Sequence, residues 1–140
     1  MPSTTLTRFN SFFSDLCNGL NDPGQHQLKL ALTNIQPLVA WSTFSQIGEI
    51  AAGGGYLAGG VPLSVISSGQ VNGLYTLLIS NLTLICSGAP MAAWRFPVIY
   101  DSTTGSLIGF GDYGSVLILD PSELVNFVFD PVQGILTGGP

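Results

Sequence analysis

The first residues that could do chemistry are the five glycines between Gly53 and Gly60, within the stretch EIAAGGGYLAGG. Glycine-rich loops cradle phosphates with their backbone N–H groups, but a P-loop also needs a Lys and a Ser or Thr directly after its glycines. Here Gly60 is followed by Val-Pro-Leu. A dinucleotide-binding turn needs a helix at its last glycine, whereas Pro62 and the β-branched residues after it favour a strand. The stretch therefore predicts a shaped turn or a close backbone approach, and no nucleotide cofactor.

The other reactive side chains do not form a catalytic set that the sequence can reveal. The only histidine, His26, has no metal-ligating neighbour at a typical ligand spacing, so no metal site is predicted. A catalytic dyad of Cys17 with His26 is conceivable, but the two residues would have to come together by coincidence at the end of a helix. Four acids adjoin predicted turns, where Asp commonly bonds backbone N–H groups: Asp101, Asp112, Asp120 and Asp130. We therefore predict a protein that is not an enzyme and has no cofactor.

Charge is scarce in this chain. Of its 140 residues, 46% are hydrophobic and only 8% are charged, against about 25% in typical globular domains. A chain with so few charges and a mean hydropathy of +0.46 is expected to bury part of its surface against other subunits. The formal net charge is −5 with three basic residues, which excludes the basic footprint that nucleic-acid binding requires.

Membrane insertion is not expected either. The longest apolar-rich run, LYTLLISNLTLIC, is shorter than the roughly 20 residues that a spanning helix needs. The N-terminal residues MPSTTLTRFNSFFSDL lack the basic head and continuous apolar run of a secretion signal. The two cysteines, Cys17 and Cys86, lie far apart in the sequence and are expected to be buried free thiols.

The apolar spacing predicts one N-terminal amphipathic helix over about residues 4–20. One helical face would carry the apolar residues Leu6, Phe9, Phe13, Leu16 and Leu20, with Phe12 widening it. Ser3, Thr4 or Thr5 would cap its start, and the segment NGLNDPG would end it. A strand at about 27–33 and a long loop at about 34–60, with a helical turn near 42–47, would follow.

Short β-like runs separated by turn dipeptides fill residues 61–137. The runs are PLSVISS, GLYTLLI, LTLICS, WRFPVIYD, SLIGFGDYG, SVLIL, LVNFVFD and GILT. Because no strand–helix alternation follows residue 50, a doubly wound α/β fold is disfavoured. We predict that residues 1–140 form a single, mainly β domain, a β-sandwich or jelly-roll-like fold with one N-terminal amphipathic helix.

Four segments in a fixed order carry a resemblance to a known family. They are KLALTN (29–34), EIAAGGGYLAGG (49–60), VIYDSTTGSLIGFGDYGS (98–115) and FVFDPVQGIL (127–136). This order resembles a family of small structural proteins encoded in the virion gene clusters of tailed bacteriophages, over nearly the whole chain. The segment 50–60, with Asp112 and Gly114, is the most specific part. The chain departs from the family pattern at GGGY, where an Asn is expected before the last glycine.

The resemblance implies a non-enzymatic virion component. It is most similar to capsid decoration (cement) proteins, which sit on the capsid exterior, often as homotrimers, over junctions between subunits of the major capsid protein. A tail or head-fibre component is the alternative. A small carbohydrate-binding β-domain, with Trp94 or Tyr113 beside Asp112, is the second alternative. Aromatic side chains dominate buried interfaces, and the candidate interface residues are Phe12, Trp41, Phe44, Gly53, Gly55, Tyr56, Gly59 and Gly60.

Overall fold

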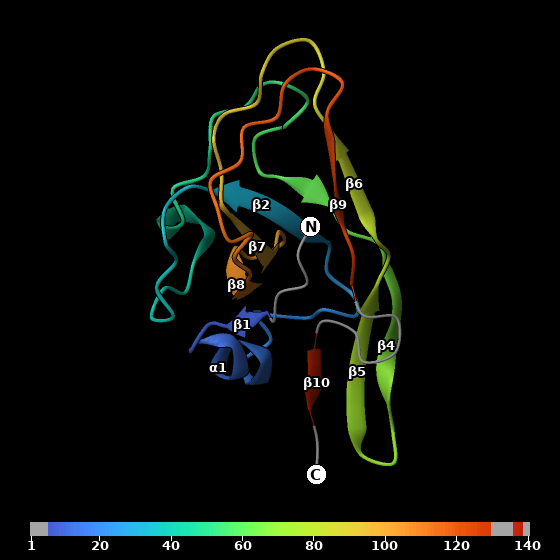
Figure 1. The fold of residues 1–140 in the computed structure, drawn as a ribbon. Coiled ribbons are helices and arrows are strands. Elements are labelled where there is room, and N and C mark those ends of the chain that lie inside the picture. Colours follow the sequence, from blue (N-terminus) through green and yellow to red (C-terminus); the bar gives the residue numbers. More distant parts are fainter. Residues whose placement is uncertain (1–5, 130–135, 139–140) are drawn as a thin grey trace.

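The computed structural model describes residues 6–129 and 136–138, and the chain is mainly β with several antiparallel sheets and one short helix, as predicted (Figure 1). The elements are β1 (Thr7–Arg8), α1 (Phe12–Cys17), β2 (Leu28–Thr33), the 3₁₀ helix η1 (Phe44–Gln46), β3 (Val61–Pro62), β4 (Val65–Val71), β5 (Leu74–Ile79), β6 (Leu82–Ile85), β7 (Phe96–Asp101), β8 (Ser106–Phe110), β9 (Leu124–Phe127) and β10 (Leu136–Gly138).

A five-stranded antiparallel sheet in the order β1-β8-β7-β2-β3 forms the centre of the molecule. On β2, the alternation of Leu28, Leu30 and Leu32 places three buried side chains on one face, as the sequence indicates. Ala31 and Thr33 are buried as well. Their burial follows because both faces of this sheet are covered, so the strand is not half-exposed.

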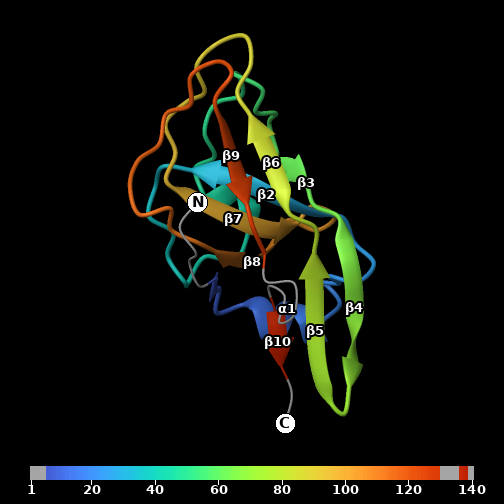
Figure 2. The ribbon, with the colours of Figure 1, turned by 45° about the vertical axis from the view of Figure 1, so that its right-hand side comes forward.

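The first face of this sheet packs against a second layer made of two smaller sheets, β10-β5-β4 and β6-β9. Figure 2 shows the strands of this layer crossing those of the central sheet. Between the layers lies the main core, which includes Leu30 and Ile99 from the central sheet and Leu77, Trp94 and Phe127 from the other side. Sandwiches of this kind bury the inward residues of both layers in one apolar interior.

The second face of the central sheet is covered by the loop that follows β2. Phe44 of η1 stacks on Tyr100 of β7, with ring centroids 4.3 Å apart. Trp41 and Phe44 pack against a second apolar cluster that includes Ile47 and Phe110. A capping box between Thr43 and Gln46 starts η1, which confirms the predicted helical turn near residues 42–47. The part of the long loop from Trp41 to Ile47 is therefore a structured cover for this face, whereas Ile50 and Tyr56 of the same loop lie in the main core.

The helix prediction is wrong in its extent and in its buried face. Instead of residues 4–20, α1 spans only Phe12–Cys17, because Thr7 and Arg8 pair with β8. Phe9 and Phe12 are buried, whereas Phe13, Leu16 and Leu20 are exposed. Pairing with a strand distant in the sequence overrides the helical period here. Ser11 stands at the start of the helix; the predicted caps Ser3, Thr4 and Thr5 lie outside the described residues.

Two further segment predictions need correction or a limit. The run SVLIL (115–119) forms no strand; it contributes only an isolated bridge between Leu117 and Trp94. Residues 130–135 of the predicted β-rich segment lie outside the described residues, so the prediction that Asp130 forms a turn is not addressed. The other predicted runs appear among β3 to β10 with boundaries shifted by a few residues, GILT being described only from Leu136 on.

Candidate functional site

The glycine-rich stretch folds into a tight turn. Backbone hydrogen bonds join Gly53 and Tyr56 in both directions, at 2.9 and 3.1 Å. Gly54 has φ +62°, and a Cβ there would lie 2.7 Å from the carbonyl oxygen of Ala89. Gly60 has φ +93°, and a Cβ there would collide with the carbonyl of Leu30. The predicted close backbone approach is therefore confirmed, because these glycines let the turn touch two other segments.

Tyr56 and Glu49 anchor this turn from within. The Tyr56 side chain is 1% exposed, and its hydroxyl donates to Glu49 Oε2 at 2.5 Å and accepts from the N–H of Leu32 at 3.1 Å. Burial, together with the hydrogen bond to Glu49, raises the pKa of Tyr56 far above its ordinary value. Tyr56 therefore stays neutral and ties the turn to Leu32, near the end of β2.

The Glu49 carboxylate also accepts a hydrogen bond from a backbone N–H group that a bound phosphate would need. Glu49 Oε2 accepts from the N–H of Gly59 at 2.8 Å, and the Tyr100 hydroxyl donates to the carbonyl of Gly59. A negatively charged side chain beside the loop repels an anion, and the N–H it accepts from is no longer free. This geometry agrees with the prediction that the stretch is not a phosphate cradle.

The structure separates the residues predicted for an interface into two groups. Phe12 and Tyr56 lie in the main core, and Gly60 is buried, so these three residues offer almost no surface to a partner. The rings of Phe12 and Tyr56 complete the core of the chain itself, and a direct contact through them or through Gly60 stays a prediction. Trp41, Phe44 and Gly59 are partly exposed, and Gly53 and Gly55 are exposed; a contact through them stays a prediction.

A buried polar cluster lies between the loop after α1 and the β7–β8 turn. The Asp101 carboxylate is fully buried, lies 2.7 Å from His26 Nδ1, and accepts from the N–H groups of Asp22 and Thr103. Next to it, the Ser106 hydroxyl donates to Asp15 and accepts from Asn21. The bond to Thr103 is the turn role predicted for Asp101. Its pairing with His26 joins residues 75 positions apart, and no sequence spacing indicates it.

This cluster holds the loop after α1 against the β7–β8 turn. The Ser106 hydroxyl is engaged by Asp15 and Asn21, and His26 Nδ1 is engaged by Asp101. Within residues 6–129 and 136–138, no group of three His, Cys, Asp or Glu side chains could hold a metal ion.

The cysteine prediction is half confirmed. Both thiols are free, and Cys86 is buried with its sulfur donating to the carbonyls of Ala89 and Leu119. Cys17 is exposed, contrary to the expectation, because the short α1 turns its last residue toward solvent.

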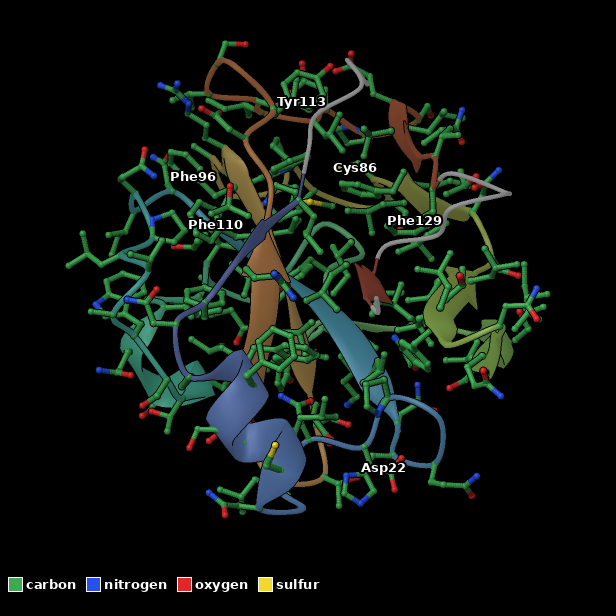
Figure 3. All side chains as sticks on the ribbon, turned by 90° about the horizontal axis from the view of Figure 1, so that it is seen from below. Asp22, Cys86, Phe96, Phe110, Tyr113 and Phe129 are labelled. Atoms are coloured by element: carbon green, nitrogen blue, oxygen red, sulfur yellow. The ribbon has the colours of Figure 1, made fainter. Side chains whose placement is uncertain are left out.

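The aromatic platform imagined for a carbohydrate site is absent at Trp94. This side chain is fully buried and packs against the rings of Tyr113 and Phe127. Asp112 pairs with Arg95 at 2.8 Å and accepts from the N–H of Gly114, which is the predicted turn role. The Arg95 guanidinium lowers the pKa of Asp112. Figure 3 places Tyr113 and Asp22 at opposite ends of the molecule, so this region and the Asp101 cluster do not form one site.

The feature that remains is apolar surface. Exposed large apolar side chains occur on several elements; they are Phe13, Leu16, Leu20, Ile35, Leu38, Val39, Leu57, Ile66, Val71, Leu74, Ile85, Val116, Ile118, Leu124 and Val128. Single exposed apolar residues are normal, but contiguous ones mark interaction sites. The candidate functional site is therefore sought on this apolar surface, and sequence periodicity did not indicate where on the fold it lies.

In the part of the chain that the structure describes, no helix is long and apolar enough to cross a bilayer. Comparison of the chain with protein-family models, with curated proteins and with solved structures found no match.

Proposed function

We propose that this protein is a non-enzymatic structural component of a tailed-bacteriophage virion, and specifically a capsid decoration protein that binds over junctions between capsid subunits. The observation that carries the proposal is the set of four ordered motifs, which resembles that family over nearly the whole chain. Two features support it: the low charge and the exposed apolar side chains, which suit a protein that packs against its own copies and against the major capsid protein.

A decoration protein acts by shifting a binding equilibrium and not by catalysing a reaction. If it binds the assembled shell and not the free capsid subunits, it shifts the assembly equilibrium toward the shell by mass action. Each contact can be weak, because many copies act on one lattice and each bound oligomer engages it at several points. A mainly β domain held together by a continuous apolar core provides a rigid body for such a contact.

The test uses purified protein and capsids assembled from the major capsid protein of the same virion. We expect the protein to be an oligomer in solution, to co-sediment with expanded capsids, and to raise their disruption temperature. Unassembled capsid protein is the control, and it should not bind. A monomer that binds neither expanded capsids nor unassembled capsid protein would refute the proposal.

Location in the virion separates the head proposal from the tail or head-fibre alternative. Electron microscopy of virions with a tag on this chain should place the label over the head surface. A label confined to the tail or to fibres would replace the decoration role with the alternative. A glycan array tests the carbohydrate-binding alternative, for which the buried Trp94 leaves no exposed platform at that position.

A further inference from the structure

Strands β4 and β5 form a hairpin, here called the arm (Val65–Ile79), which extends away from the central sheet (Figures 1 and 2). The turn at its tip is Asn72-Gly73, with positive φ at both residues, as a tight two-residue hairpin requires. One face of the arm turns inward, since Leu77 is fully buried and Tyr75 packs against the main core.

The opposite face of the arm is uncharged, and its side chains are exposed or partly exposed. The register pairs Ser67 with Leu78, Gly69 with Thr76, and Val71 with Leu74 on this outward face. Near the tip, Val71 is 74% exposed and Leu74 is 48% exposed.

The outward face continues into a shallow cavity at the base of the arm. At the register shift between Val65 and Ser67, Ile66 is 64% exposed. Ile66 borders the cavity of about 230 Å³ together with Leu78 and with Val128, which follows β9. A contiguous uncharged surface therefore runs from the tip of the arm to its base.

The edge of the arm is open too. In the three-stranded sheet β10-β5-β4, β4 is the outer strand, and no strand among the described residues pairs with its other side. Its residues from Ile66 to Val71 are all exposed. Monomeric proteins commonly protect such edges with charged residues, Pro or a β-bulge. The β4 sequence VISSGQV has no charged residue and no Pro, and its one register shift lies at the base of the arm, between Val65 and Ser67. Unprotected edges pair with further strands through backbone hydrogen bonds.

Charge favours a second copy of this chain as the occupant. Each copy carries a formal net charge of −5, so two copies repel one another electrostatically. This repulsion is weakest where the surfaces that face each other carry no acidic residues. The sequence contains no charged residue between Glu49 and Arg95, and the whole arm lies within that interval. A positively charged partner would find no acidic residue on the arm to pair with. A second copy would present the same uncharged arm, so no charged group would be buried without a partner.

We propose that copies of this chain associate through the arm, with the free edge of β4 and the outward face around Ile66 and Val71 buried against a second copy. The inference deepens the proposed function and rests on it in one respect only, the premise that the copies assemble. Strand pairing supplies the hydrogen bonds, and the apolar face supplies the area removed from water.

The test measures mass by sedimentation, and hydrogen exchange of the β4 amides, in the absence of capsids. We expect the unmodified chain to be an oligomer whose β4 amides exchange more slowly as concentration rises. The double variant Ile66→Lys, Val71→Lys should be monomeric at the same concentration. Both side chains are exposed, and an unchanged circular dichroism spectrum with a cooperative urea transition would show that the variant folds. Leu57→Lys, at a side chain 70% exposed outside the arm, is the matched control and should remain oligomeric.

Three outcomes overturn the proposal. They are a monomeric parent chain, an oligomer that survives the double Lys variant, and dissociation by Leu57→Lys alone, which would move the contact to the glycine-rich turn. Protection of the β4 amides only on capsids would make the capsid subunit the occupant. An arm-dependent oligomer that fails to bind capsids would refute the proposed function and leave this inference standing.

Discussion

The glycine-rich turn (Gly53–Gly60) and the arm (Val65–Ile79) are adjacent in the sequence and opposite in character. The turn has irregular backbone and five glycines, yet Tyr56 fastens it to β2 through a buried hydroxyl. The arm has regular strands and a well-formed turn, yet its outer strand is exposed almost throughout. Backbone regularity therefore says little about which segment is fastened to the core and which is free to meet a partner.

The difference lies in where each segment's side chains and backbone groups find partners. The turn places one large aromatic ring into the main core, and its closest approaches are to the backbone of other segments. Among the residues that the structure describes, the arm is paired along one edge only, and it packs on the main core with one face. Substitutions in the turn should therefore reduce folding stability, whereas substitutions on the outward face of the arm should change association.

The largest effect is expected for Tyr56→Ala. Removing a buried aromatic ring leaves a cavity and two unpartnered polar groups, so the free energy of unfolding should fall by about 4 kcal/mol. Urea unfolding followed by fluorescence measures it. A variant that keeps its stability and loses only its assembly would instead support the direct contact that the sequence suggested for Tyr56.

A somewhat smaller loss is expected for Gly60→Ala, at about 3 kcal/mol. The added Cβ meets the Leu30 carbonyl and the residue must hold φ +93°, so both sterics and backbone strain oppose folding. The matched control is Gly69→Ala in the arm, where a Cβ has open space and φ is not in the left-handed region. Its unfolding free energy should stay the same or rise slightly. Equal losses in the two variants would erase the contrast between turn and arm.

Tyr56→Phe should cost about 2 kcal/mol near neutral pH, because the ring remains but the hydrogen bonds to Glu49 and Leu32 are lost. The raised pKa of Tyr56 gives this loss a pH dependence. The hydroxyl stays protonated in the folded chain and ionises in the unfolded chain above pH 10.0, so its contribution is complete below that pH and declines above it.

The measurement is the difference in unfolding free energy between the parent chain and Tyr56→Phe from about pH 8 to about pH 11. The difference should shrink as the pH rises past 10.0. Tyr100 also has a raised pKa, but it is present in both chains and its effect cancels. A difference that stays constant over this range would show that Tyr56 ionises normally in the folded chain.

The smallest effect is expected for Asp112→Asn, outside both regions. Arg95 lowers the pKa of Asp112 below its usual 3.8, so the ion pair stabilises the fold above that pH and the contribution is lost as pH falls through the folded-state pKa. Both side chains are well exposed, and solvent screening keeps the effect small. Stabilities of parent and variant should differ slightly at neutral pH and converge in acid; a gap that persists in acid would assign the effect to the turn hydrogen bond with Gly114 instead.

Local patterns were most reliable where one physical requirement dominated. The alternation around Leu30 indicated a strand, the turn dipeptides indicated where the short strands end, and the missing Lys after Gly60 argued against a phosphate site. The N-terminal segment failed because the helical spacing of Phe9 and Phe13 competed with strand pairing to β8, and only the tertiary contact of Phe9 with Phe110 resolves that competition. The Asp101–His26 pair could not be predicted, since each residue alone is typical of a turn.

The sequence by itself determined the β class of the fold, the positions of most strands, the scarcity of charge, and the need for glycine around Tyr56. Each of these follows from local sterics, hydrophobic period or composition. Only the tertiary structure decided that Tyr56 and Phe12 face inward while the arm faces outward. Burial depends on which distant segments pack together, and those segments are chosen by the apolar area and backbone hydrogen bonds that the whole chain can satisfy at once.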